Sequence, residues 1–186
     1  KNFDVHQENI VVGNGAAELI KSFIENQNEK IGFVRPTFEE YPNRYDKENS
    51  VIFVPQNKDF SYTADDIMNF FDDKDIGLLV VINPDNPSGN YIPKSDLLRL
   101  VNWAAKKGIK IVIDESFVDF SDCEDSTIIL QDILDANKHL YVVKSISKYN
   151  AKIVEETEED ERLLGYTCAL STIANMRGFD ASDVEL

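Results

Sequence analysis

Short apolar runs alternate with amphipathic stretches along most of the chain, and this alternation restricts the fold more than any other feature. The short runs are rich in β-branched residues and end at Gly, Pro, Asn or Asp, whereas the stretches between them have helical spacing. Alternating strands and helices predict a three-layer α/β/α fold around a mostly parallel sheet. The expected strands are 10–12, 31–34, 51–54, 78–82, 109–113 and 140–143.

The sequence also indicates where several helices begin and end. Thr37 and Thr63 are each followed by an acidic residue three positions later, which is the spacing of a capping box. An apolar stripe after Pro93 predicts a long helix, and Gly108 stands where a C-terminal glycine is expected. The run Leu78–Ile82 is apolar throughout, as expected for a strand covered on both faces.

Composition excludes several classes of function. The chain has 34 acidic and 19 basic residues among 186, a net charge of −15 that opposes binding to nucleic acid. No apolar run of about 18 residues or more is present, so we expect no membrane-spanning helix. The two cysteines and two histidines are too few and too scattered for a metal site. We expect free thiols and a cytoplasmic protein.

Four polar stretches directly follow expected strands. They are Gly13-Asn14-Gly15, Asn83-Pro84-Asp85-Asn86, Asp114-Glu115 and Ser145–Lys148. Ligands of open parallel sheets bind beyond the carboxyl ends of the strands, so these stretches are expected to meet at one site. The glycine-containing turn could bind phosphate through backbone N–H groups, and a partly desolvated lysine beside hydroxyls could act as a nucleophile. Each stretch also has a simpler interpretation, as a turn, a turn cap or a solvated lysine.

Taken together, these stretches resemble the class I and II aminotransferases of fold-type I. Within that family they are most similar to histidinol-phosphate aminotransferase and to threonine-phosphate decarboxylase. The resemblance implies the large, cofactor-binding domain of such an enzyme, with pyridoxal 5'-phosphate (PLP) as its cofactor. The residues that carry it are Val12-Gly13-Asn14-Gly15-Ala16-Ala17-Glu18, Arg35-Pro36-Thr37-Phe38 with Tyr41, Asn83-Pro84-Asp85-Asn86-Pro87-Ser88-Gly89, Asp114-Glu115-Ser116-Phe117 and Ser145-Ile146-Ser147-Lys148.

The resemblance assigns catalytic roles to Lys148 and Asp114. Lys148 would form the Schiff base with the cofactor and move the proton at the substrate Cα. Asp114 would pair with the pyridinium nitrogen, which allows the ring to act as an electron sink. The resemblance also implies that Asn86 hydrogen-bonds the phenolic oxygen and that Phe38 stacks on the ring. The groups that would hold the phosphate are the backbone amides of Gly15 and Ala16 and the hydroxyls of Ser145 and Ser147.

The chain departs from the family pattern after this lysine. Six of the seven residues in 155–161 are acidic, and we interpret this run as a solvated loop or helix face. The arginine that grips the phosphate in the family would then be Arg162, delayed by an insertion. We expect a PLP-binding core over 1–148 and an atypical acidic segment over 149–186, with one further strand within 164–171. The family's small C-terminal domain is not expected in this chain.

Three functions are compatible with these motifs. The first is an aminotransferase that acts on amino-acid and keto-acid substrates, and the resemblance implies a homodimer for the full-length protein. The second is a PLP-dependent decarboxylase, which shares every motif and differs in which bond of the substrate Cα is broken. The third is a catalytically inactive domain that binds only the cofactor or a partner chain. We expect the 186-residue chain alone to be incomplete and inactive.

Overall fold

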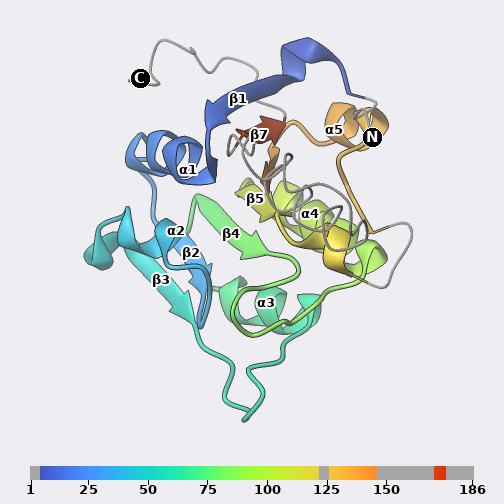
Figure 1. Ribbon diagram of the computed structural model, residues 1–186. Helices are drawn as coiled ribbons and strands as arrows, with labels where there is room; N and C mark the ends of the chain where they lie inside the picture. Colours follow the sequence, from blue (N-terminus) through green and yellow to red (C-terminus); the bar gives the residue numbers. More distant parts are fainter. Residues whose placement is uncertain (1–4, 122–125, 146–169, 175–186) are drawn as a thin grey trace, which may run out of the picture.

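Seven strands form a single sheet in the order β1-β7-β6-β5-β4-β2-β3 (Figure 1). The computed structural model describes residues 5–121, 126–145 and 170–174. Strands β3, β2, β4, β5 and β6 are consecutive parallel neighbours, whereas β7 is antiparallel to both β1 and β6. The strands are β1 (Ile10–Asn14), β2 (Ile31–Val34), β3 (Ser50–Phe53), β4 (Leu78–Ile82), β5 (Lys110–Asp114), β6 (Leu140–Ser145) and β7 (Leu170–Ala174).

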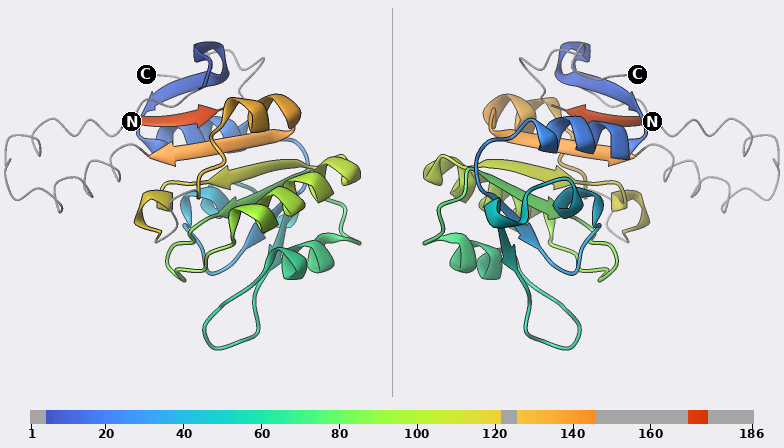
Figure 2. Two further views of the ribbon diagram at one scale, coloured as in Figure 1. Left: turned by 90° about the vertical axis from the view of Figure 1, so that its right-hand side faces the viewer. Right: turned by 90° about the vertical axis from the view of Figure 1, so that its left-hand side faces the viewer.

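Helices cover both faces of this sheet, as the two side views in Figure 2 show. The predicted three-layer α/β/α fold is therefore confirmed. Within the described ranges, no helix is long and apolar enough to cross a membrane. The helices are α1 (Ala16–Glu25), α2 (Glu40–Asn43), α3 (Ala64–Phe71), α4 (Lys94–Lys107) and α5 (Gln131–Ala136), with 3-10 turns η1 (Gln7–Asn9), η2 (Lys47–Asn49) and η3 (Val118–Phe120).

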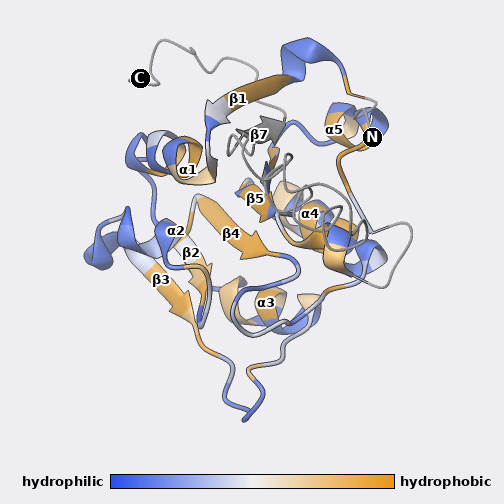
Figure 3. Ribbon diagram, in the orientation of Figure 1, coloured by the Kyte–Doolittle hydropathy of each residue, from blue (hydrophilic) through white to orange (hydrophobic). Residues whose placement is uncertain are grey.

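The central strand β4 supplies apolar side chains to both layers of the core. Leu79 and Val81 pack into a cluster with the apolar faces of α3, α4 and α5. Leu78, Val80 and Ile82 point the other way, into a cluster with α1 and Tyr41 of α2. All five residues of β4 are buried, and Figure 3 shows the strand as apolar along its length. Burying each such side chain contributes about 1.5–3 kcal/mol, so this strand is a major source of stability.

Most of the predicted helix boundaries agree with the structure, but one is wrong. Thr63 and Asp66 form the predicted capping box at the start of α3, and Gly108 closes α4 with a left-handed φ of 71°. Thr37, in contrast, does not cap a helix: α2 begins at Glu40, and the Thr37 hydroxyl donates to Asp85 Oδ1 at 3.0 Å. The buried Asp85 carboxylate must obtain its hydrogen-bond donors from the protein, whereas an exposed helix end can bond to water. The Thr37 hydroxyl therefore bonds Asp85 instead of capping a helix.

The antiparallel strand lies slightly later than predicted. We expected a strand within 164–171, and the structure has β7 at Leu170–Ala174, while 164–169 lie outside the described residues. β7 pairs Leu170 with Asn14 of β1 and Ser171 with Ser145 of β6. Because β1 and β6 are both antiparallel to β7, they run in the same direction. The ends of β1 and β6 therefore lie at the same edge of the sheet.

Candidate active site

Hydrogen bonds join the carboxyl ends of β4, β5 and β6 at one edge of the sheet. The backbone N–H of Asn83 donates to the Asp114 carbonyl oxygen at 2.8 Å. The backbone N–H of Ser145 donates to the Ser116 hydroxyl at 3.1 Å. The end of β1 lies at this same edge, so the four predicted polar stretches follow or begin at the ends of strands on one side of the sheet.

Asp114 is a buried carboxylate at the end of β5. Its residue is 2% exposed; Oδ2 accepts a hydrogen bond from the Tyr41 hydroxyl at 2.7 Å, and Oδ1 accepts one from the Ser116 N–H at 2.8 Å. Burial raises the pKa of Asp114, while these two hydrogen bonds and the charge of Lys144 act in the opposite direction. Among the described residues, none forms an ion pair with Asp114. A buried carboxylate held by neutral donors is suited to receive a cationic group.

Tyr41 is a member of this site that the sequence did not identify as functional. It lies on α2 and is 1% exposed, with its ring packed in the core below β4 and its hydroxyl on Asp114. Burial raises the pKa of Tyr41, and the charge of Asp114 raises it further, so the hydroxyl remains a donor at neutral pH. Its position in the family-like stretch 35–41 could have marked Tyr41 as a site residue. That stretch alone does not show which residue the hydroxyl contacts.

Glu115, next in sequence, faces a different part of the molecule. It is fully buried; Oε1 accepts from the Ile128 N–H at 2.7 Å and Oε2 from the Thr127 hydroxyl at 2.6 Å. Burial raises the pKa of Glu115 to about 7, although its hydrogen bonds and the charge of Lys144 oppose this shift. Lys144 itself is buried and forms an ion pair with Asp119. Glu115 therefore ties the segment that begins at 126 to the end of the sheet.

Glu115→Gln is expected to change how stability depends on pH. The folded protein holds the Glu115 proton up to about pH 7, whereas the unfolded chain releases it near the ordinary value of 4.5. This contribution to stability is complete below pH 4.5 and is lost as pH rises to about 7. Glutamine does not titrate. The free energy of unfolding of the variant, relative to that of the wild type, should therefore rise by about 3 kcal/mol across that pH range.

Urea unfolding of both proteins at about pH 5 and about pH 8 measures this gain directly. Glu25→Gln, at an exposed position of α1, is the matched control. If the difference in unfolding free energy between Glu115→Gln and wild type is the same at both pH values, the prediction is wrong.

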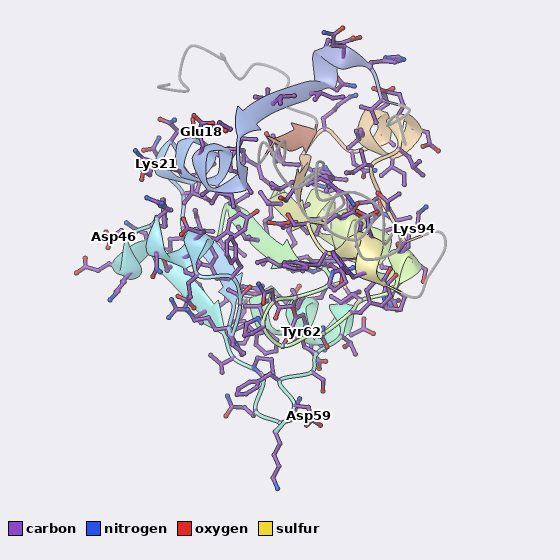
Figure 4. All side chains as sticks on the ribbon, in the orientation of Figure 1. Glu18, Lys21, Asp46, Asp59, Tyr62 and Lys94 are labelled. Atoms are coloured by element: carbon purple, nitrogen blue, oxygen red, sulfur yellow. The ribbon has the colours of Figure 1, made fainter. Side chains whose placement is uncertain are left out.

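The loop after β4 is fixed by its own polar side chains. Asn83 bonds Ile92 through both its amide nitrogen and its oxygen, at 2.9 and 2.7 Å. Asn90 does the same with the backbone of Tyr62, at 3.0 and 3.1 Å. Figure 4 shows Tyr62 at the base of the projecting β3–α3 loop and Asp59 at its tip. The base of that loop therefore supports the predicted cofactor-binding stretch around Asn86.

Two predicted neighbours of the cofactor ring lie in the loops after β2 and β4. The Phe38 residue is 36% exposed, although it is a large apolar group. The residue Asn86 is half-buried, and its side-chain amide forms no hydrogen bond within the described part of the chain. Phe38 thus presents part of an apolar ring to its surroundings, and the Asn86 side-chain amide can still hydrogen-bond a ligand.

The turn between β1 and α1 has the backbone geometry that the predicted phosphate site requires. Gly15 caps the ten-residue helix α1 with a left-handed φ of 102°. A Cβ at Gly13 would lie 2.6 Å from the Leu19 side chain, so α1 packs too closely on β1 for any other residue there. Glu18, labelled in Figure 4, accepts the Asn14 N–H at 2.6 Å. Glu18 therefore satisfies one donor of this turn, and the predicted phosphate contacts are the next amides along, Gly15 and Ala16.

The remaining predicted site residues are the last residue of β6 and residues that come after it in the sequence. Ser145 ends that strand and is buried, 6% exposed. Ser147, Lys148 and Arg162 lie outside the described residues, so their predicted roles stay predictions.

Comparison with known proteins identifies relatives of this chain. The sequence profile of the family Aminotransferase class I and II matches residues 1–151. L-serine phosphate decarboxylase from Sulfurospirillum multivorans is 32% identical over 157 residues, which cover 80% of this chain and 39% of that protein. A histidinol-phosphate aminotransferase from Ruminiclostridium cellulolyticum is 30% identical over 158 residues, covering 78% and 40%. A solved structure of a decarboxylase from S. multivorans superposes with a TM-score of 0.69 at 28% identity, covering 91% of this chain and 46% of that one.

Two of these relatives have different named activities, although each matches close to four fifths of the chain. The chain spans about two fifths of the length of these curated relatives. The profile match over residues 1–151 includes β1 to β6 and the four polar stretches that were predicted to form one site. This chain belongs to the class I and II aminotransferase family.

Proposed function

We propose that this chain is the cofactor-binding part of a PLP-dependent aminotransferase that acts on an amino acid. The family is PLP-dependent and uses amino-acid substrates. The single observation that carries the proposal for this chain is the Asp114 carboxylate, which is 2% exposed and hydrogen-bonded only by neutral donors among the described residues. A buried carboxylate in that setting needs a cation, and a protonated pyridine nitrogen is one.

PLP, when bound, supplies an electron sink for the pair released at the substrate Cα. Asp114 would keep the pyridine nitrogen protonated by holding a negative charge beside it. Tyr41 and the Ser116 N–H fix the two oxygens of that carboxylate, so its direction does not depend on the ligand. Pre-organised charge of this kind is effective because it requires no rearrangement during the reaction.

Other groups of the chain would bind and orient the cofactor. In this proposal the exposed face of Phe38 would cover the ring, and the Asn86 amide would donate to the ring oxygen. The amides of Gly15 and Ala16 would hold the phosphate at the amino end of α1, where the helix dipole favours an anion. The hydroxyls of Ser145 and Ser147 would be further donors to it.

Lys148 completes the proposed set. Its amine would attach the cofactor covalently and then carry the proton that leaves the substrate Cα. This role rests on the place of Lys148 in the sequence, three residues after the end of β6, and on the family resemblance.

Decarboxylation of a phosphorylated amino acid is the second candidate function. It is supported by the 32% identity to L-serine phosphate decarboxylase, beside 30% to histidinol-phosphate aminotransferase. Both reactions use the same cofactor contacts and differ in the Cα bond that is broken. The choice between them therefore depends on residues that orient the substrate.

Product analysis distinguishes these functions. The full-length protein is incubated with PLP and either O-phospho-L-serine, or L-histidinol phosphate together with a keto acid. Transfer of the amino group without release of CO2 supports an aminotransferase, whereas stoichiometric CO2 supports a decarboxylase. Binding of PLP without either product would indicate a catalytically inactive domain that binds the cofactor. Absence of PLP binding would overturn the proposal.

In the full-length protein, Tyr41→Phe is expected to lower turnover by about tenfold, because a hydrogen bond to a charged group contributes about 1.5 kcal/mol or more. The change removes only the hydroxyl that holds Asp114 Oδ2 and leaves the ring in the core. Tyr45→Phe, which removes a hydroxyl bonded to backbone oxygens of Gln27 and Glu29, is the control. The measurement is the rate at saturating PLP and substrate. Equal rates for Tyr41→Phe and wild type would exclude a contribution from this hydrogen bond.

A further inference from the structure

Asp85 is a second buried carboxylate at the carboxyl edge of the sheet, and the proposed function gives it no task. It lies one residue before Asn86 and is 4% exposed. Within the described ranges it forms no ion pair, and burial raises its pKa. A carboxylate that is buried without a neighbouring cation destabilises the folded protein unless hydrogen bonds replace the lost hydration.

Those hydrogen bonds connect two different loops. Oδ1 accepts from the Thr37 hydroxyl at 3.0 Å, and Thr37 is the residue before Phe38. Oδ2 accepts from the Ser88 hydroxyl at 2.5 Å, on the same loop as Asn86. The backbone N–H of Asn86 also donates to this carboxylate. The Asp85 side chain is thus the direct link between the loop with Phe38 and the loop with Asn86.

The backbone of Asp85 is fixed as firmly as its side chain. Its N–H donates to the Asn90 carbonyl oxygen at 2.8 Å, and its own carbonyl accepts from the Gly89 N–H at 2.9 Å. Asn90 is in turn held on the backbone of Tyr62. Asp85 is therefore a fixed point, and a loop that hydrogen-bonds to its carboxylate is fixed with it.

We propose that Asp85 is a positioning residue for the cofactor ring: its carboxylate sets the distance between the Phe38 ring and the Asn86 amide. The inference rests on the proposed function, because it assigns those two residues to a PLP ring. An apolar face and an amide on separate loops bind a flat heteroaromatic ring only when their spacing matches it. A purely structural role would require only that the loop after β4 fold.

A carboxylate serves this purpose better than an amide. It accepts hydrogen bonds at both oxygens, so the Thr37 hydroxyl and the Ser88 hydroxyl can donate at the same time. In Asp85→Asn the amide oxygen can retain one of these donors, while the amide nitrogen presents hydrogens to the other. One of the two links is then reversed or lost.

The test compares Thr37→Val with Thr63→Val in the protein titrated with PLP. Both changes replace a threonine hydroxyl by a methyl group, but Thr37 donates to Asp85 and Thr63 caps α3. Two readouts are recorded below the melting temperature: the PLP dissociation constant, and the visible circular dichroism of bound PLP at saturation. The second depends on how the ring is held and does not change merely because the fold is less stable.

Thr37→Val is expected to weaken PLP binding by roughly tenfold, the factor for one hydrogen bond to a charged group. It is also expected to change the circular dichroism of the bound cofactor. Thr63→Val is expected to lower the melting temperature and leave both cofactor readouts as in wild type. Ser88→Ala and Asp85→Asn should behave like Thr37→Val, and these variants keep the test decisive if one of them fails to fold.

The outcomes separate this inference from the proposed function. If wild type binds PLP and Thr37→Val, Ser88→Ala and Asp85→Asn give the wild-type dissociation constant and spectrum, Asp85 is structural and the inference is wrong. If Thr63→Val changes the spectrum as much as Thr37→Val, the effect is general destabilisation and the inference is again wrong. If wild type binds no PLP, the proposed function fails and the inference fails with it.

Discussion

In the full-length protein, Asp114→Asn is expected to lower turnover by a factor between about a hundred and several thousand. Removing one partner of a buried ion pair costs about 3–5 kcal/mol, and each 1.4 kcal/mol in the barrier is about a factor of ten in rate. The amide oxygen can still accept from the Ser116 N–H, and the Tyr41 hydroxyl can accept from the amide nitrogen. The fold should therefore be retained while the charge beside the pyridine nitrogen is lost.

PLP binding should change much less than turnover in this variant. The cofactor would still be held by its phosphate contacts at Gly15 and Ala16 and by the covalent bond to Lys148. Single-turnover rates and PLP occupancy, measured on the same samples, separate the two effects. Asp96→Asn, which alters a carboxylate paired with Arg99 on the surface of α4, is the control and should behave as wild type. Unchanged turnover in Asp114→Asn would rule out the role proposed for this carboxylate.

The fold could be predicted from the sequence because its strands are separated by strong local signals. The range Ile31–Val34 and the range Leu78–Ile82 are predicted residue for residue, since each is an apolar run bounded by polar residues or glycine. The predicted strand 109–113 is shifted by one residue, because Lys110 and Asp114 extend a ladder whose register is set by β4. Tertiary pairing, rather than local pattern, decides where that strand ends.

The individual partners of the site residues could not be predicted in the same way. Thr37 has the sequence spacing of a helix cap, yet its hydroxyl bonds Asp85, 48 positions away. The Tyr41 hydroxyl bonds Asp114, 73 positions away. Such contacts exist only after the strands have assembled, and sequence spacing within one loop carries no information about them. The sequence therefore predicted that the strands before these polar stretches end at one edge of the sheet, but not which side chains support Asp114 and Asp85.

Lys148 is expected to be the only lysine that forms a borohydride-reducible adduct with PLP. In the sequence it comes three residues after Ser145, the last residue of β6, which lies at the edge of the sheet where other proposed cofactor contacts lie. The neighbouring lysine in the sequence, Lys144, offers an internal comparison: it is 3% exposed and already paired with Asp119. A buried ammonium group held by a carboxylate is poorly placed to attack an aldehyde, so proximity in sequence alone should not produce a second adduct.

Mass spectrometry of the reduced and digested protein measures this distribution. We expect the tag on the Lys148 peptide and not on Lys144. Lys148→Arg should remove the adduct and lower turnover by about 10²–10⁴-fold, the contribution of a positioned proton-transfer group. Lys107→Arg, on α4 and paired with Asp72, should retain both the adduct and the activity. A tag distributed over several lysines, or retained in Lys148→Arg, would show that the cofactor is attached elsewhere and that β6 does not deliver the reactive amine.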